Sequence, residues 1–177
     1  GEERGEHLFI STIPGRGYQF IAPVSIAPAK VAASLPDTKA AIAVLPFVNV
    51  TADPAYDHFG DGLADEIISA LSKLDGLRVA ARTSAFSFKG KQADIREIAD
   101  RLAVNLVLEG SVRKSANRLR INAQLVNAAD GCHLWSERYD REIEMHDIFD
   151  VQDEITLAVV DALKMRLAQA ERSAVLK

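Results

Sequence analysis

The sequence predicts an α/β domain with a mixed sheet, preceded by a β-hairpin, with its main elements in the order β-α-β-α-β-β-β-α. An apolar run opens the main part of the chain at residues 41–47, and two amphipathic helical segments follow it. Over residues 104–139 the apolar period then changes to two. Strands that alternate with helices favour parallel pairing, whereas successive strands joined by short turns favour antiparallel pairing. Both kinds of pairing are therefore expected in one sheet.

The first 24 residues predict the hairpin. Two short segments alternate apolar and polar residues on either side of a turn in which Gly15 and Gly17 bracket Arg16. Glycine on both sides of an arginine permits positive φ and a close approach of the backbone to another surface. Residues 25–40 contain Pro28, Pro36 and five alanines without strand or helix periodicity, which predicts a linker.

The main domain is expected over residues 41–170, followed by a tail at residues 171–177. Residues 41–47 predict a strand that is buried on both faces and has Pro46 at its end, and residues 49–59 predict a polar loop. Asp61 is expected to cap a helix that runs to about Leu74. A short strand at residues 77–81 and a loop at residues 82–91 follow.

The second half of the domain begins with a helix after Asp94, which forms a capping-box-like pair with Glu97. The alternating residues 104–112, 119–125 and 132–139 predict three successive antiparallel strands, with turns at Ala116-Asn117 and Asp130-Gly131. A long helix is expected from about Asp147 or Ile148 to Ala168.

The composition limits the chain to one sizeable core. It has 177 residues, 48% of them hydrophobic, and a formal net charge of −4, which argues against nonspecific nucleic-acid binding by the whole chain. No run approaches the roughly 20 apolar residues that span a bilayer, and the start of the chain is polar. A cytoplasmic location is therefore expected. Basic residues predominate over residues 73–120 and acidic ones over 137–154, which indicates either a partner surface or ordinary solvated faces.

Two resemblances come from motifs. The run from His7 to Val24 resembles the C-terminal wing of OmpR/PhoB-type winged-helix DNA-binding domains, whose recognition helix would precede it. Four motifs of the main domain resemble the TolB N-terminal-like domain of bacterial multidomain regulators, which commonly precedes tetratricopeptide repeats. They are AVLPF at 43–47, FGDGLADEI at 59–67, LEGSVR at 108–113 and LWSERYD at 134–140. Relatives carry either the winged helix or an adenylate cyclase domain upstream.

Two groups of residues are candidates for binding. The resemblance implies that the wing contacts DNA through Arg16, assisted by Gly15, Gly17 and Tyr18. A basic and aromatic combination within residues 82–91 indicates either loop packing or a contact with a protein or nucleic acid; it consists of Arg82, Phe86, Phe88, Lys89 and Lys91.

Several sharper interpretations are weak. A nucleotide at Gly60-Asp61-Gly62 would need a phosphate-binding glycine pattern that the sequence lacks. Cyclase chemistry needs carboxylates that hold two metal ions, and four acidic residues are close in sequence: Asp53, Asp57, Asp61 and Asp65. Cys132 and His133 are adjacent on a strand, where they face opposite sides, so Cys132 is expected to be a small buried residue. No catalytic residue, metal or cofactor is expected.

These observations predict a fragment of a cytoplasmic DNA-binding transcriptional regulator with a noncatalytic TolB-like signalling or interaction domain. Its expected partners are promoter DNA, through the complete winged helix, and a protein partner or second copy through the α/β domain; no membrane is expected. The alternatives are a noncatalytic accessory domain of an adenylate-cyclase-like signalling protein, or a protein-interaction scaffold.

Overall fold

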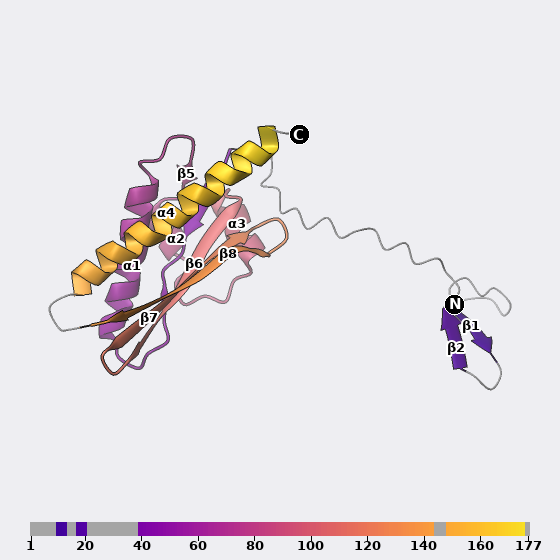
Figure 1. Ribbon diagram of the computed structural model, residues 1–177, viewed down its shortest axis with the longest axis horizontal. Helices are drawn as coiled ribbons and strands as arrows, with labels where there is room; N and C mark the ends of the chain where they lie inside the picture. The colour runs from indigo at the N-terminus through magenta and orange to yellow at the C-terminus, as the bar shows by residue number, and fades with distance from the viewer. Residues whose placement is uncertain (1–9, 14–16, 21–38, 144–147, 176–177) are drawn as a thin grey trace. The chain divides into compact units, whose positions relative to one another are not determined.

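The computed structural model describes residues 10–13, 17–20, 39–143 and 148–175, which fall into two units, Gly1–Ala32 and Ala33–Lys177 (Figure 1). In the first unit, β1 (Ile10–Ile13) pairs antiparallel with β2 (Gly17–Phe20), with Ile13 opposite Gly17. The predicted hairpin is confirmed. Gly15 and Arg16 lie outside the described residues, so their contact with DNA stays a prediction.

The second unit contains a mixed six-stranded sheet and four helices, which confirms the predicted fold class. Its strand order is β5-β3-β6-β7-β8, with β4 paired to β6. The pairs β3–β5, β3–β6 and β4–β6 are parallel, and the pairs β6–β7 and β7–β8 are antiparallel. The strands are β3 (Ala41–Val44), β4 (Val48–Asn49), β5 (Arg78–Val79), β6 (Leu106–Ser115), β7 (Arg118–Asn127) and β8 (His133–Glu142).

The first predicted strand is shorter than expected. It ends at Val44, and the chain resumes pairing at β4 with a new register in which Val48 lies opposite Ser111. Pro46 lies between the two short strands, where no ladder hydrogen bond is needed from its missing N–H. The apolar run therefore forms strand β3 and the segment that connects β3 to β4. Phe47, in this connecting segment, is 2% exposed and belongs to the core.

The helix α1 (Ala55–Leu71) begins earlier than predicted. Asp61 does not cap it but lies inside it; Pro54 holds the cap position, and the Asp53 carboxylate accepts a hydrogen bond from the Ala55 N–H at 3.0 Å. The helix starts early because Phe59 and Tyr56 are buried one and two turns before Leu63 and extend its apolar stripe. The segment predicted as a polar loop thus contains the first turn of the helix.

The loop predicted at residues 82–91 contains the short helix α2 (Arg82–Phe86). After it, α3 (Ile95–Leu102) begins as predicted, with the Asp94 carboxylate accepting a hydrogen bond from the Arg96 N–H at 2.8 Å. The helix ends at Ala103, which has a left-handed φ of 52°. The N-terminal cap was predictable because its chemistry is local to four residues of sequence.

Replacing the cap residue of α3 gives a first testable prediction. An Asp94→Ala variant leaves the Arg96 N–H without its side-chain acceptor, and its free energy of unfolding is expected to fall by about 1 kcal/mol. Chemical denaturation followed by circular dichroism measures the change. Asp75→Ala, at an exposed loop position, is the control and is expected to leave the midpoint unchanged; equal losses in the two variants would contradict the capping role.

The sheet separates two apolar layers. The helices α1 and α4 (Ile148–Val175) contact each other and lie over one face, where the large core cluster contains residues of both helices and of β3, β6, β7 and β8 (Figure 1). On the other face, α3 packs on a smaller cluster that includes Ala99, Val107 and Ala128. The rest of this second face, along β7 and β8, carries polar side chains.

The antiparallel part of the sheet follows the prediction closely. Ala116, with φ of 51°, and Asn117 form the turn between β6 and β7, as predicted, and Trp135 and Tyr139 share the core face of β8. The final helix extends to Val175, beyond the predicted end at Ala168. Cys132 is exposed rather than buried, because it precedes β8 in a turn where its N–H donates to the Asp130 carboxylate at 2.9 Å.

Candidate functional site

A pocket of about 700 Å³ lies where β3 ends, and it is the candidate site of the domain. Its walls are the chain between β3 and β4, the segment from Phe88 to Ala93, the start of α3, and the adjoining stretches of β6 and β7. In open α/β sheets, ligands commonly bind outside the carboxyl ends of parallel strands, and this pocket occupies that position. The lining is polar on the sheet side, with Glu109, Ser111, Asn122 and Gln124.

The structure divides the candidate loop at residues 82–91 into two parts. Arg82 and Phe86 belong to α2 and turn away from the pocket. The guanidinium carbon of Arg82 lies 4.3 Å from the centroid of the Phe86 ring, and its Nε lies 3.1 Å from a carboxylate oxygen of Asp65 on α1. The Arg82 side chain therefore links α2 to α1.

Phe88, Lys89 and Lys91 do line the pocket. Phe88 is only 7% exposed, and the charged groups of Lys91 and Arg101 each lie 6.0 Å from its ring centroid. A ring covered in this way forms a wall rather than a platform on which bases stack. Loop packing, one of the interpretations left open by the sequence, therefore describes Phe88 best.

The four acidic residues from Asp53 to Asp65 do not assemble into a metal site. The Asp53 carboxylate accepts a hydrogen bond from the Ala55 N–H, Asp61 forms an ion pair with Lys89 at 2.5 Å, and Asp65 forms one with Arg82. Across the residues that the structure describes, no group of three or more His, Cys, Asp or Glu side chains is placed to hold a metal ion. The Gly60-Asp61-Gly62 segment lies within α1 rather than at its N-terminus.

Sequence reasoning missed the residues that shape the pocket, chiefly Phe47 and Gly110. A Cβ atom on Gly110 would lie 2.3 Å from Cε1 of Phe47 and 2.3 Å from the carbonyl oxygen of Asn122. Glycine at this position lets the Phe47 ring lie against β6. The polar side chains of the sheet wall were visible in the sequence as the polar half of the alternation in β7.

Beside the pocket, the polar face of the sheet carries a two-point ion pair. Arg120 donates to Asp140 from Nε at 2.7 Å and from Nη2 at 3.2 Å. Hydrogen bonding from Arg120 lowers the pKa of Asp140, and the same bond raises the pKa of Arg120. On the core face, burial and then the nearby Glu137 raise the pKa of Tyr139 well above its usual range.

The Arg120–Asp140 pair gives a second testable prediction. A carboxylate whose pKa is lower in the folded than in the unfolded state contributes stability above the unfolded pKa, and this is lost as the pH falls through the folded pKa. In an Asp140→Asn variant, the free energy of unfolding is expected to fall less steeply between about pH 4.5 and pH 2 than in the wild type. The difference is small because both side chains are partly exposed.

Denaturation curves at a series of pH values measure this slope. Asp161→Asn is the matched control, because Asp161 is exposed on α4 and lies 3.8 Å from Lys164. The control is expected to keep the wild-type slope. If it flattens the profile as much as Asp140→Asn, the Arg120 pair is not the source of the pH dependence.

The fold and the site together define a small α/β domain with a sheet-side pocket and two sheet-packed helices. Residues 38–158 match the family described as the HilA/YgeH-like transcriptional regulator, second domain, and the chain belongs to this family. A protein of Rhizobium meliloti (strain 1021) named "Putative adenylate cyclase 3" is 53% identical over 133 residues, which are 75% of this chain. They are 22% of that protein, so the chain spans about a fifth of its relative's length.

Solved structures show the same fold at low identity. Lipoprotein GNA1162 from Neisseria meningitidis superposes with a TM-score of 0.50 and 18% identity over 71% of this chain and 96% of its own. Protein XCC0632 from Xanthomonas campestris gives a TM-score of 0.50 and 12% identity over 78% of this chain and 93% of its own. In the described part of this chain, no helix is long and apolar enough to cross a membrane.

These comparisons correct the resemblances drawn from the motifs. The prediction of an OmpR/PhoB-type winged helix followed by a TolB N-terminal-like domain is wrong: residues 38–158 match the HilA/YgeH-like second domain, and the solved structures with a TM-score of 0.50 are the lipoprotein and the Xanthomonas protein. The motifs misled because they encode architecture. AVLPF marks a strand end, and LEGSVR marks a strand crossed by an aromatic ring; such features recur wherever elements pack in this way.

Proposed function

We propose that this domain is a noncatalytic regulatory module of a larger signalling protein of the adenylate cyclase type. The observation that carries the proposal is the 53% identity to "Putative adenylate cyclase 3", within which the matching region makes up 22% of the chain. Most of that relative therefore lies outside the shared domain, and a separate region can supply the chemistry that its name describes.

The arrangement of charged groups supports a noncatalytic role. Active sites gather titratable groups whose pKa values are strongly shifted. Among the described residues, the groups whose pKa is shifted are Arg120 on β7 and Tyr139 and Asp140 on β8. None of these three residues lines the pocket. The ammonium group of Lys89, which lines the pocket, forms an ion pair with Asp61 rather than pointing toward a reacting group.

The second candidate is a regulatory domain of a transcription factor, and the family match favours it. The two candidates differ in what the domain is joined to, a catalytic region or a DNA-binding region. In both, the pocket is the place where a signal acts, because it combines buried apolar walls with a polar floor on a rigid sheet.

The deciding experiment uses the full-length gene product and the 177-residue chain side by side. Cyclic AMP formation from ATP is measured for both, together with a Lys91→Glu/Glu109→Lys exchange in the full-length protein that reverses two pocket charges at constant net charge. We expect activity in the full-length protein, none in the 177-residue chain, and a changed rate in the exchange variant.

The matched control exchanges the exposed pair Asp161 and Lys164 on α4 and is expected to keep the wild-type rate. Cyclic AMP formation by the 177-residue chain alone would overturn the noncatalytic assignment. A full-length protein that makes no cyclic AMP but binds promoter DNA would replace the proposal with the second candidate.

A further inference from the structure

The strand β8 forms one edge of the six-stranded sheet and pairs only with β7 in the described part of the chain (Figure 1). It is ten residues long, from His133 to Glu142, whereas β5 at the opposite edge has two. A long edge strand presents a row of backbone N–H and C=O groups to any chain that pairs with it.

The register shows which backbone groups face outward. Ile143 donates from its N–H to the carbonyl of Asn117, one position beyond the pair of Arg118 with Glu142. Hydrogen-bonded pairs in an antiparallel ladder recur at every second residue. From Trp135 onward, past the irregularity at Leu125/Val126, the odd-numbered residues of β8 therefore bond to β7. The outward backbone groups belong to Ser136, Arg138, Asp140 and Glu142.

We propose that β8 pairs antiparallel with β8 of a second copy of this chain, with the two-fold axis passing at Tyr139. A two-fold axis perpendicular to the sheet keeps each face continuous, so residues opposite each other share a face. The outward hydrogen bonds also require even-numbered residues to lie opposite even-numbered ones. These two conditions leave only the registers in which the two-fold axis passes through a residue rather than between two residues.

The charges of β8 select among these registers. With the axis at Tyr139, Arg138 lies opposite Asp140 and Glu137 lies opposite Arg141, and symmetry repeats both pairs. Opposite charges that face each other across strands stabilise the pairing, whereas like charges destabilise it. Moving the axis to Glu137, Arg138 or Asp140 places that charged residue opposite its own copy. The sequence SERYDRE is therefore self-complementary in the Tyr139 register.

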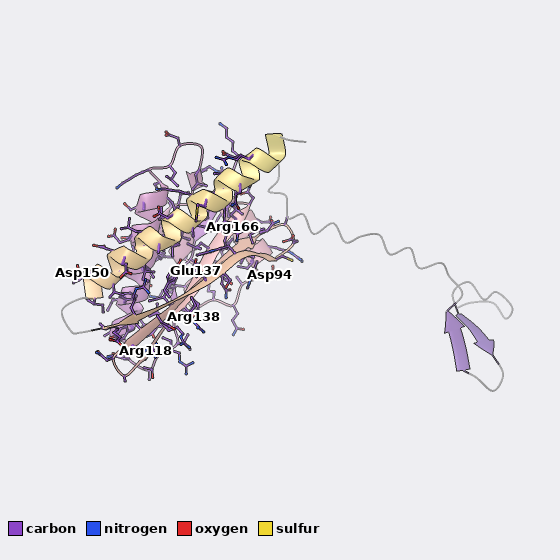
Figure 2. All side chains as sticks on the ribbon, viewed as in Figure 1. Asp94, Arg118, Glu137, Arg138, Asp150 and Arg166 are labelled. Carbon is purple, nitrogen blue, oxygen red and sulfur yellow. The ribbon has the colours of Figure 1, made fainter. Side chains whose placement is uncertain are left out.

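The side chains are available for these contacts. Glu137 and Arg138 are exposed and are labelled on β8 in Figure 2. Both carboxylate oxygens of Asp140 already accept from Arg120, and Arg138 Nε lies 3.7 Å from Oδ2, so an added guanidinium extends an existing network. Arg141 donates to Glu154 at 2.7 Å and from Nη1 to the outward carbonyl of Asp140 at 2.9 Å. Two of its five N–H groups are left for a second carboxylate, and the Asp140 carbonyl keeps a second lone pair for an incoming N–H. The proposal holds whether or not the domain regulates a catalytic neighbour.

The order of positive and negative charges along β8 distinguishes this edge strand from one that avoids pairing. Natural edges are blunted by charges, bulges or prolines that repel an incoming strand. In the registers centred on the neighbouring residues Arg138 and Asp140, a like-charged pair lies on the axis, whereas every charged pair of the Tyr139 register is of opposite sign, which favours a single partner in a single alignment. That partner is an identical strand.

Sedimentation equilibrium of the 177-residue chain tests the proposal with two charge-reversed variants. Variant one is Glu137→Lys/Arg138→Glu, and variant two is Asp140→Lys/Arg141→Glu. Each places like charges opposite each other in its own homodimer, whereas a mixture of the two restores every opposite-charge pair. Circular dichroism confirms that each variant is folded, and the Asp161→Lys/Lys164→Glu exchange on α4 is the control.

We expect the wild type and the control to dimerise, each variant alone to bind itself at least about tenfold more weakly, and the equimolar mixture to recover the wild-type affinity. A monomeric wild type, including one whose edge is covered by another part of the same chain, would overturn the proposal. So would a variant that dimerises as tightly as the wild type. Dimers that weaken in both variants but are not recovered in the mixture would exclude the Tyr139 register and overturn the proposal as stated.

Discussion

A Gly110→Ala variant is expected to unfold at a much lower denaturant concentration than the wild type, with a loss of about 3 kcal/mol in the free energy of unfolding. The added Cβ would lie 2.3 Å from the carbonyl oxygen of Asn122 and 2.3 Å from the Phe47 ring. Neither can retreat easily, because Asn122 belongs to β7, which is paired on both sides by β6 and β8, and Phe47 is 2% exposed within the core. Urea denaturation measures the change.

Gly62→Ala is the matched control for this prediction. The Cβ added there meets only the flexible end of Gln152, whose Oε1 lies 3.1 Å away, and alanine favours the interior of α1 by up to about 1 kcal/mol. The control is expected to unfold at or above the wild-type midpoint. If the two variants behave alike, contact with Phe47 and Asn122 is not what requires glycine at position 110.

The second large effect is expected at the contact between α1 and α4. Ile155 on α4 is fully buried and belongs to the same core cluster as Leu63 and Ile67 of α1. An Ile155→Ala variant loses buried apolar surface and leaves a cavity, so its free energy of unfolding is expected to fall by about 2–5 kcal/mol. Thermal and urea denaturation are the measurements.

Leu157→Ala provides the comparison, because Leu157 lies on the same helix two residues further on and is 64% exposed. Its effect is expected to stay within about 0.5 kcal/mol. A similar loss in both variants would mean that α4 is stabilised by its intrinsic helicity rather than by packing on α1.

The sequence predicted the elements whose signals are local. The alternation in β6, β7 and β8 and the Asp94 cap each depend on a few neighbouring residues, and the structure confirms them. Elements fixed by distant contacts were placed less well. The start of α1 depends on the burial of Tyr56 and Phe59 against strands far along the chain, so a segment with polar composition is helical.

The pocket was the least predictable part for the same reason. Its lining residues come from five separate stretches of sequence, and none of those stretches carries a ligand-binding motif. Of the candidate loop, Phe88, Lys89 and Lys91 reach the pocket. Arg82 and Phe86 do not, because α2 turns them toward Asp65 on α1. A single sequence cannot show this division, since it arises because the first half of the loop forms the helix α2.

Phe47 joins two parts of the domain that are otherwise separate. It lines the pocket on one side and belongs to the core beneath α1 on the other, and its carbonyl oxygen would lie 2.5 Å from a Cβ on Gly60. Phe47 therefore forms part of the pocket wall and also supports helix α1. A ligand that displaced the Phe47 ring would therefore disturb the core on which α1 and α4 pack.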